Sequence, residues 1–323
     1  MDFLRSEIHD DLAASIDALL SKADSSAIAR AWVAGDRDPA SAVFAQLAQT
    51  GVFGLMIDEE HGGAGAGAVE MVVAAKELGR HGVPGPLAET LAVVPALLTA
   101  AGATSILERI VAGELVTVAA APGAPRAADA PTAAEVYLLA DGVLSTAEVV
   151  RTESTVDPTR TVSTLRAAHT MCEDVDGARA TDLGALATAA QLLGLGERML
   201  AIASEYALAR KQFGRAIGSF QAVKHHLADV AIAVEMARPL VYGAAVGVDG
   251  GAPETTHVAR DVSAAKVAAA DAAYLASRRS LQVLGAIGYT AEHDLSLYVT
   301  KTRALIGAWG TPAAHRDRIL ETL

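Results

Sequence analysis

Apolar residues recur at helical spacing through the first third of the chain. They lie three or four residues apart, on one face of a helix, at Ile8, Leu12, Ile16 and Leu19. The same pattern predicts further helices over 38–52 and 69–78. The glycine-rich run 62–67 separates these two helices, and Gly79 ends the second one.

The pattern changes between residues 114 and 175, where short segments rich in Val and Thr alternate with turn residues. Such segments are typical of strands in a small sheet. The predicted strands are 115–120, 135–140, 143–145, 148–152 and 161–165.

Longer helical patterns return in the last part of the chain. They predict helices over 192–210, 220–246 and 258–284, followed by a glycine-rich turn and one last helix toward Leu323. The predicted fold is therefore mostly α with a small central β domain. We expect an N-terminal helical domain at 1–113, a reduced β domain at 114–175 and a C-terminal helical bundle at 176–323.

Composition supports a packed protein that associates with other chains. Of the 323 residues, 52% are hydrophobic and only 4% are aromatic, which suits closely packed, alanine-rich helices. The mean hydropathy is high, at +0.32. The apolar stretches 91–103 and 264–276 are too short or too interrupted to cross a bilayer, so no membrane span is expected. A wide subunit interface would bury the excess apolar surface.

Charge and cysteine content narrow the possible partners and location. A formal net charge of −12 disfavours binding to nucleic acid. Cys172 is the single cysteine and cannot form an internal disulfide, which fits a reducing, cytoplasmic location.

Common metal and nucleotide motifs are incomplete in this chain. Glu254 and His257 have the spacing of a di-iron ligand pair, but the second copy that a di-iron site needs is missing. His225 and His226 are adjacent and therefore point to different helix faces. The run 62–67 follows no strand and lacks the Lys-Ser/Thr end of a phosphate loop. We expect 254–257 to begin a helix, His225 and His226 to be packing or surface residues, and 62–67 to form a turn. No metal site is expected.

Two segments carry groups that suit an anionic ligand. In 206–221, a helix ends near Arg210 and is followed by Gly214 and Gly218. In 282–292, an amide precedes another glycine-rich helix end. Arginine can hold a phosphate through two hydrogen bonds, and backbone amides near glycine can bind an anion.

The order and spacing of these segments resemble the C-terminal domain of the acyl-CoA dehydrogenases. The matching segments are Arg210–Gly214, Phe220–Gln221, Gln282–Tyr289 and Trp309–Thr311. In the N-terminal part, 57–65 and 76–79 are similar to further family motifs. The resemblance implies the family fold, FAD as cofactor, and α,β-dehydrogenation of an acyl-CoA thioester.

The family's catalytic glutamate has no counterpart at either of its known positions. By resemblance, one position is Trp309 and the other, on the first long helix of the C-terminal domain, is Gly184. Neither residue can accept a proton, and a positioned base is worth about 10²–10⁴ in rate. We therefore expect no catalytic residue in this chain.

The resemblance implies that half of a flavin site is kept. The residues that family members supply to a neighbour's FAD diphosphate and adenosine correspond to Arg210, Gln212, Phe213, Gln221, Gln282, Gly285 and Ala286. Ala286 stands where the family has glycine. The loop that holds a subunit's own flavin ring is not recognisable, and 121–125 is its nearest remnant.

This asymmetry predicts a subunit of a heteromeric acyl-CoA dehydrogenase. A longer catalytic subunit would supply the base and bind most of the acyl-CoA, in an α2β2 assembly, and the substrate could be a steroid side-chain thioester. One alternative is a self-sufficient homo-oligomer with a relocated base at Glu197, Glu292 or His293. Another is a catalytically dead structural homologue.

Overall fold

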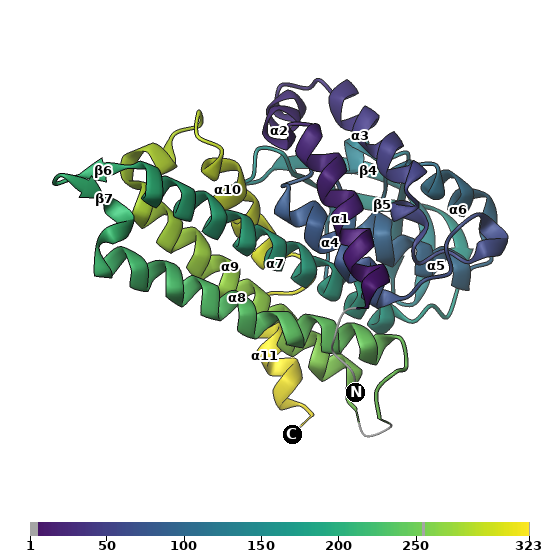
Figure 1. The fold of residues 1–323 in the computed structure, drawn as a ribbon. Coiled ribbons are helices and arrows are strands. Elements are labelled where there is room, and N and C mark those ends of the chain that lie inside the picture. The colour runs from purple at the N-terminus through teal and green to yellow at the C-terminus, as the bar shows by residue number, and fades with distance from the viewer. Residues whose placement is uncertain (1–5, 254–255, 323) are drawn as a thin grey trace.

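The N-terminal part of the protein is a cluster of short helices. The computed structural model describes residues 6–253 and 256–322. The apolar face of the first helix is buried through Ile16 and Leu20, as its spacing predicts. The helices are α1 (Glu7–Lys22), α2 (Ser25–Val33), α3 (Asp38–Gln49), α4 (Ala68–Arg80), the π-helix η3 (Glu89–Val93), α5 (Val94–Ala100) and α6 (Thr104–Val111) (Figure 1).

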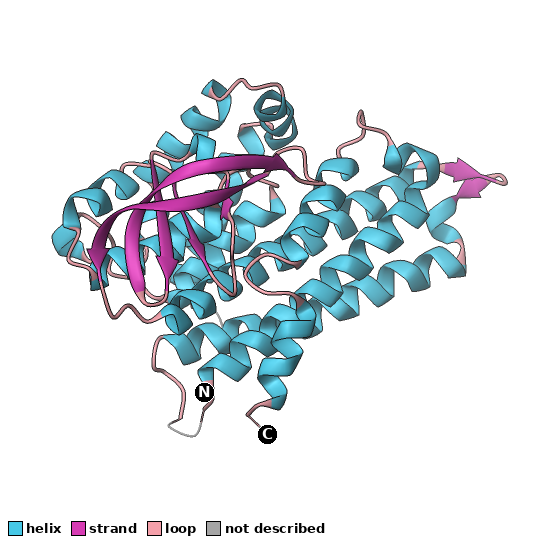
Figure 2. Cartoon of the chain, turned by 180° about the vertical axis from the view of Figure 1, so that it is seen from behind, coloured by secondary structure: helices cyan, strands magenta, loops and turns pink. Residues whose placement is uncertain are grey.

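A five-stranded sheet follows and lies against one side of the helices (Figure 2). Its strand order is β1-β3-β4-β5-β2, with β1 and β3 parallel and the other pairs antiparallel. The strands are β1 (Val116–Ala120), β2 (Ala127–Ala128), β3 (Glu135–Ala140), β4 (Val143–Ser154) and β5 (Thr161–Cys172).

Two strands are longer than the sequence pattern predicted. The segments 143–145 and 148–152 form one strand, β4. Its pairing with β5 contains register shifts, which let the strand continue where the alternation of apolar and polar residues breaks. Strand β5 likewise continues past Leu165 to Cys172. Strands β4 and β5 extend each other by pairing, and the residue pattern of one strand alone does not reveal this pairing.

The C-terminal part is a bundle of long helices beside the sheet (Figures 1 and 2). Its helices are α7 (Gly177–Ala209), α8 (Gln221–Val248), α9 (Val258–Leu284), α10 (Leu295–Ile306) and α11 (Pro312–Leu320). A small hairpin of β6 (Lys211–Gln212) and β7 (Arg215–Ala216) joins α7 to α8, and the 3₁₀-helix η6 (Gly285–Tyr289) follows α9. The mostly α fold class with a central sheet is confirmed.

Glycines allow the N-terminal helices to pack directly onto the bundle. A Cβ at Gly79 of α4 would lie 2.3 Å from the carbonyl oxygen of Gln191. A Cβ at Gly194 of α7 would lie 2.0 Å from the carbonyl oxygen of Lys76. The backbones of α4 and α7 can approach this closely only because neither position carries a side chain.

Two of the predicted helix boundaries in the C-terminal part were wrong. Helix α7 begins at Gly177 rather than near residue 192, because the Asp176 side chain caps it by accepting from the Ala178 amide at 2.8 Å. The predicted last helix is two helices, α10 and α11, separated by the turn 307–311. Of the predicted metal-like pair, Glu254 lies outside the described residues, and His257 immediately precedes α9.

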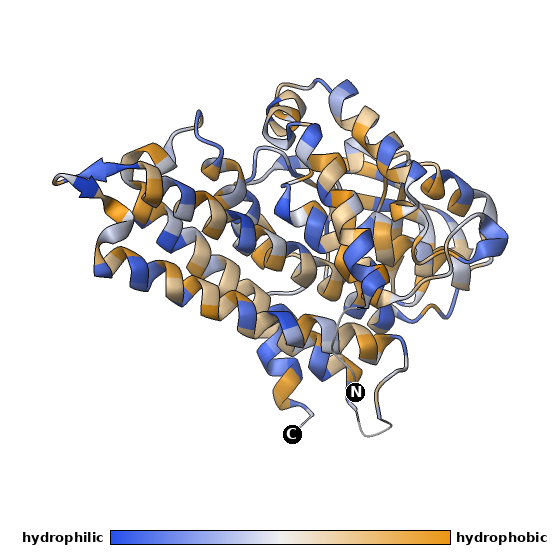
Figure 3. Cartoon of the chain, in the orientation of Figure 1, coloured by the Kyte–Doolittle hydropathy of each residue, from blue (hydrophilic) through white to orange (hydrophobic). Residues whose placement is uncertain are grey.

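Helix α8 is long and apolar enough, by length and composition alone, to cross a membrane. A core helix of a globular protein meets the same criterion, and α8 packs along α7 and α9 through Val230, Val234 and Val241. Apolar residues also remain on its outer face (Figure 3). No other helix in 6–253 and 256–322 meets the criterion.

Candidate functional site

Trp309 occupies the turn between α10 and α11 and is almost fully buried, with 1% of its surface exposed. Its indole Nε1 donates a hydrogen bond to Oε1 of Glu89 in η3, at 2.9 Å. Trp309 has a φ of +54° and Gly310 a φ of +100°, so the turn adopts left-handed backbone at two successive residues. The surrounding packing must hold this conformation, which is unfavourable for a tryptophan.

The indole lies directly against Gly184 of α7. A Cβ at Gly184 would be 2.1 Å from Cδ2 of Trp309, a separation that real atoms do not reach. The two positions that the resemblance assigned to a base are therefore neighbours in space. In this chain Gly184 has no side chain, and the indole of Trp309 fills the space next to it.

Two buried side chains hold the turn from the bundle side. Lys266 of α9 donates to the carbonyl oxygens of Ile306 at 2.8 Å and Gly310 at 3.3 Å. Burial lowers the pKa of Lys266 to about 7. His315 of α11 donates from Nε2 to the Trp309 carbonyl oxygen at 2.9 Å and accepts from Ser263 at Nδ1, 3.1 Å away. Burial lowers the pKa of His315, which favours this neutral form.

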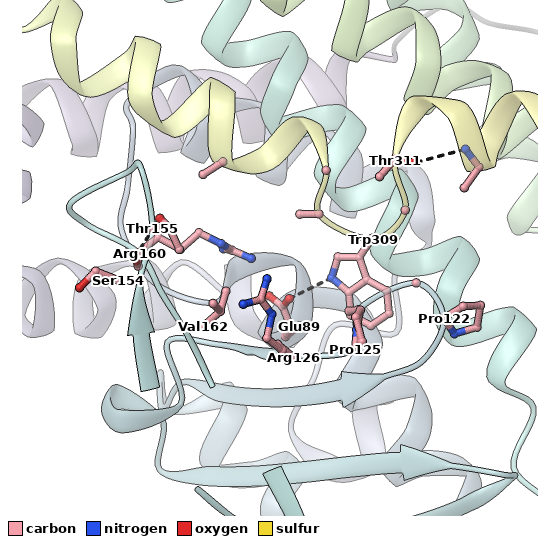
Figure 4. Close-up of a pocket in the computed structure, with 17 residues that line it drawn as sticks. Glu89, Pro122, Pro125, Arg126, Ser154, Thr155, Arg160, Val162, Trp309 and Thr311 are labelled. Atoms are coloured by element: carbon pink, nitrogen blue, oxygen red, sulfur yellow. Dashed lines mark hydrogen bonds between the residues drawn. The ribbon is translucent and has the colours of Figure 1, made fainter. Parts of the chain in front are cut away.

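A cavity of about 530 Å³ opens beside the indole, between the sheet and the bundle (Figure 4). Segment 122–125 lines it from the sheet side, and residues of the α10–α11 turn line it from the bundle side. Arg126 and Arg160 point into it (Figure 4). The remnant loop named from the sequence thus lies at the cavity.

Glu89 is a buried carboxyl at this cavity that the sequence interpretation missed. Burial raises its pKa, and the positive charge of Arg160 opposes that rise. Its Oε2 has no hydrogen-bond partner among the described residues. Glu89 is the only acid in the apolar run 87–98, which was a signal that it would be buried with a specific partner.

The three residues considered for a relocated base do not line this cavity. Glu197 forms ion pairs with Lys76 at 3.2 Å and with Arg238 at 3.0 Å. His293 accepts the Leu295 amide at the start of α10, and Glu292 is exposed. The geometry therefore gives none of them access to the position between Gly184 and Trp309.

The predicted cofactor-binding residues lie away from the cavity, where α7 and α9 end (Figure 1). None of them lines the cavity beside Trp309, and all are exposed. They divide between the β6–β7 hairpin with its flanks (Arg210, Gln212, Phe213, Gln221) and the last turn of α9 with η6 (Gln282, Gly285, Ala286). The structure brings the two sequence segments to the same end of the bundle (Figure 1).

This end of the bundle carries a strongly exposed aromatic ring and an arginine whose guanidinium is unpaired among the described residues. Phe213 has 92% of its surface exposed and meets Phe220 edge to face, with ring centroids 6.2 Å apart. Arg215 stacks on the same Phe220 ring at 4.1 Å. Within the described residues, the Arg210 guanidinium has no hydrogen bond or ion pair. An exposed aromatic and a free guanidinium suit contact with another molecule.

These observations test where an FAD could fit. At the cavity, the indole and its hydrogen bond to Glu89 occupy the place beside Gly184, where the resemblance places a base in family members. At the exposed end, Arg210 and the amides of Gln212 and Gln282 offer donors that a diphosphate accepts. The exposed end therefore offers donors that fit a diphosphate, and the indole already fills the place beside Gly184.

One cluster in the N-terminal part has the composition of a metal site. Ligand atoms of Asp17, Glu77 and His81 lie within 4.8 Å of one another. The Arg80 guanidinium already bonds Asp17 at 2.9 Å and Glu77 at 3.3 Å. The cluster is therefore an ion-pair network in this structure.

Comparison with known proteins identifies the family. The family model of the acyl-CoA dehydrogenase N-terminal domain matches residues 6–114, and that of the C-terminal domain matches residues 178–323. Acyl-CoA dehydrogenase IpdE2 of Mycobacterium tuberculosis is 35% identical over 292 residues, which cover 88% of this chain and 87% of that protein.

Solved structures agree on the fold. The steroid ACAD Tcur3481–Tcur3483 superposes with a TM-score of 0.87 at 24% identity, covering 98% of this chain and 97% of that one. The ChsE4–ChsE5 complex from Mycobacterium tuberculosis gives 0.83 at 22% identity, covering 99% and 98%. The expected class, an FAD-dependent oxidoreductase acting on a CH–CH group, is confirmed at the level of the family. The chain belongs to the acyl-CoA dehydrogenase family.

Proposed function

We propose that this chain is the subunit of a heteromeric acyl-CoA dehydrogenase that holds the FAD diphosphate and adenosine for a longer catalytic partner. The observation that carries the proposal is the contact between Trp309 and Gly184. It fills the position from which a base would act, while the predicted FAD-binding residues remain exposed at the other site.

The partner supplies what this chain lacks. It contributes the glutamate that removes the α-proton and binds most of the acyl-CoA, and FAD accepts the hydride. The assembly is α2β2 and cytoplasmic, with this chain's Arg210 on the diphosphate and Phe213 covering the nucleotide. Two neighbours with similar folds carry two-component names, Tcur3481–Tcur3483 and ChsE4–ChsE5, which supports a heteromer.

The substrate we propose is a CoA thioester derived from a steroid. The Tcur3481–Tcur3483 neighbour is a steroid acyl-CoA dehydrogenase, and its whole length is similar in fold to this chain. In this proposal the partner's residues determine which acyl group is accepted, because the partner binds most of the acyl-CoA.

Arg210→Ala in the co-expressed complex tests the diphosphate contact. A charge-assisted hydrogen bond to the diphosphate is worth about 1.5–3 kcal/mol, so FAD affinity should fall by roughly tenfold to a hundredfold. Flavin retained after dialysis, measured by absorbance, reports the change. Arg166→Ala is the control, since Arg166 is an exposed arginine of β5.

Two outcomes would contradict the proposal. One is FAD retention that is equal in the Arg210→Ala and Arg166→Ala complexes. The other is dehydrogenase activity with bound FAD in this chain purified alone, because the isolated chain has no base at Gly184 or Trp309.

A further inference from the structure

The cavity beside Trp309 has the size of a ligand site, although the indole fills the space beside Gly184. Its volume of about 530 Å³ lies within the range of small-molecule pockets. It is bounded by the 122–125 loop, the β4–β5 connection and the α10–α11 turn, which come from both the sheet and the bundle (Figure 4).

The cavity has an excess of positive charge. Arg126 forms an ion pair with Glu153 at 3.0 Å, but Arg151 shares the same carboxylate at 2.7 Å. Arg160 is half-buried, and its guanidinium has no hydrogen bond or ion pair within the described residues.

Two buried carboxyls lie near Arg160, but neither forms a hydrogen bond or ion pair with it within the described residues. Glu89 and Asp129 both act on Arg160 electrostatically, and burial raises the pKa of each. Each also keeps one oxygen without a partner among the described residues, Oε2 of Glu89 and Oδ2 of Asp129. A half-buried guanidinium that lines a cavity and has no side-chain partner there can pair with an external anion.

Part of the wall is apolar, although Ser154, Thr155 and Thr311 also line the cavity. Pro122, Pro125 and Val162 face the cavity from the sheet side, and Trp309 and Ala308 from the bundle side. A cavity with an apolar patch beside an unpaired arginine fits an organic anion better than an inorganic one.

We propose that this cavity binds an organic monocarboxylate with a flat apolar body, its carboxylate on Arg160 and its body against Trp309 and the prolines. Such a site would let the non-catalytic subunit sense a small carboxylic acid. The proposal requires neither FAD nor the partner chain, so it stands or falls separately from the proposed function.

Titration of the full-length chain with 2-naphthoate tests the site. Trp32 and Trp309 are the only tryptophans, so Trp32→Phe leaves Trp309 as the reporter in the cavity wall. We expect a saturable change of Trp309 fluorescence, and the same affinity by calorimetry on the wild-type chain. Naphthalene-2-carboxamide, which has the same shape without charge, should bind about tenfold or more weakly.

Variants separate this site from surface binding. Arg160→Gln should weaken 2-naphthoate binding by about tenfold or more, and Arg160→Lys should weaken it less. Arg166→Gln is the matched control, because Arg166 is exposed, pairs with Glu148 and does not line the cavity. Circular dichroism of each variant checks the fold.

Four results would overturn the proposal. They are no saturable fluorescence change, equal affinity for the acid and the amide, equal loss in Arg160→Gln and Arg166→Gln, or tighter binding of inorganic phosphate than of 2-naphthoate.

Discussion

Trp309 and Gly184 are in contact, and they stand at the two positions that the resemblance assigned to a base. Gly184 leaves room on α7, and the indole takes that room and anchors itself on Glu89. The sequence interpretation found both positions separately, from the resemblance to the family. Their contact depends on how α7 packs against the α10–α11 turn, and no local pattern contains that information.

Gly184→Ala should destabilise the chain by about 1–3 kcal/mol, because its Cβ would overlap the indole. Urea unfolding followed by circular dichroism measures the change in the free energy of unfolding. Gly177→Ala on the same helix is the control, since its Cβ would meet Leu139 at an ordinary 3.7 Å and should cost nothing. Equal stability of the two variants would show that the indole does not lie on Gly184.

At the scale of elements, periodicity predicted the helices well and their ends less well. The pattern over 258–284 predicted α9 with both bounds correct. Periodicity missed the first turns of α7, because the glycines and alanines there carry little amphipathic signal and the Asp176 cap sets the start of the helix. It also divided β4, since the bulged register against β5 is a property of the pair.

The candidate site shows the same division between local and tertiary information. The order of the sequence motifs indicated Arg210 and Gln282 as candidate cofactor-binding residues. The structure places their segments at one end of the bundle (Figure 1). Glu89 escaped notice because its role comes from a hydrogen bond to a residue 220 positions away.

The turn between α10 and α11 should depend on pH through Lys266. Its pKa is about 7 in the folded protein, against 10.5 for a lysine exposed to water, so between these values the unfolded chain binds more protons. Stability from this residue therefore rises as pH increases from 7 to 10, by at most roughly 1.4 kcal/mol per pH unit.

Lys266→Met tests this dependence. The difference in unfolding free energy between wild type and variant, from urea titrations at pH 7 and 9.5, should shift in favour of the wild type at the higher pH. Lys22→Met, at an exposed position, is the control. A difference that stays constant over this range would mean that Lys266 is charged when folded.

At the scale of the whole molecule, the chain leaves an apolar stripe uncovered on α8. Ile232, Met236 and Leu240 follow one another at four-residue spacing and are 63%, 68% and 45% exposed. Val230, Val234 and Val241 of the same helix are buried. The high mean hydropathy of the sequence is thus partly explained by a helix face that another subunit can cover.

Met236→Glu should weaken assembly with the partner by about 2 kcal/mol or more, because a carboxylate would replace apolar area buried in the interface. Sedimentation of the co-expressed complex measures the association. Ile8→Glu changes an exposed apolar residue on α1 and should leave assembly unchanged. Loss of assembly in both variants, or in neither, would argue against this face as the interface.

The flavin content of the purified heteromer tests the central claim most directly. If this chain holds only the diphosphate half of the cofactor, the complex saturated with FAD should contain about one flavin per pair of unlike chains, by absorbance against total protein. About one flavin per chain would mean that the cavity closed by Trp309 also accepts a flavin ring, and would contradict the account.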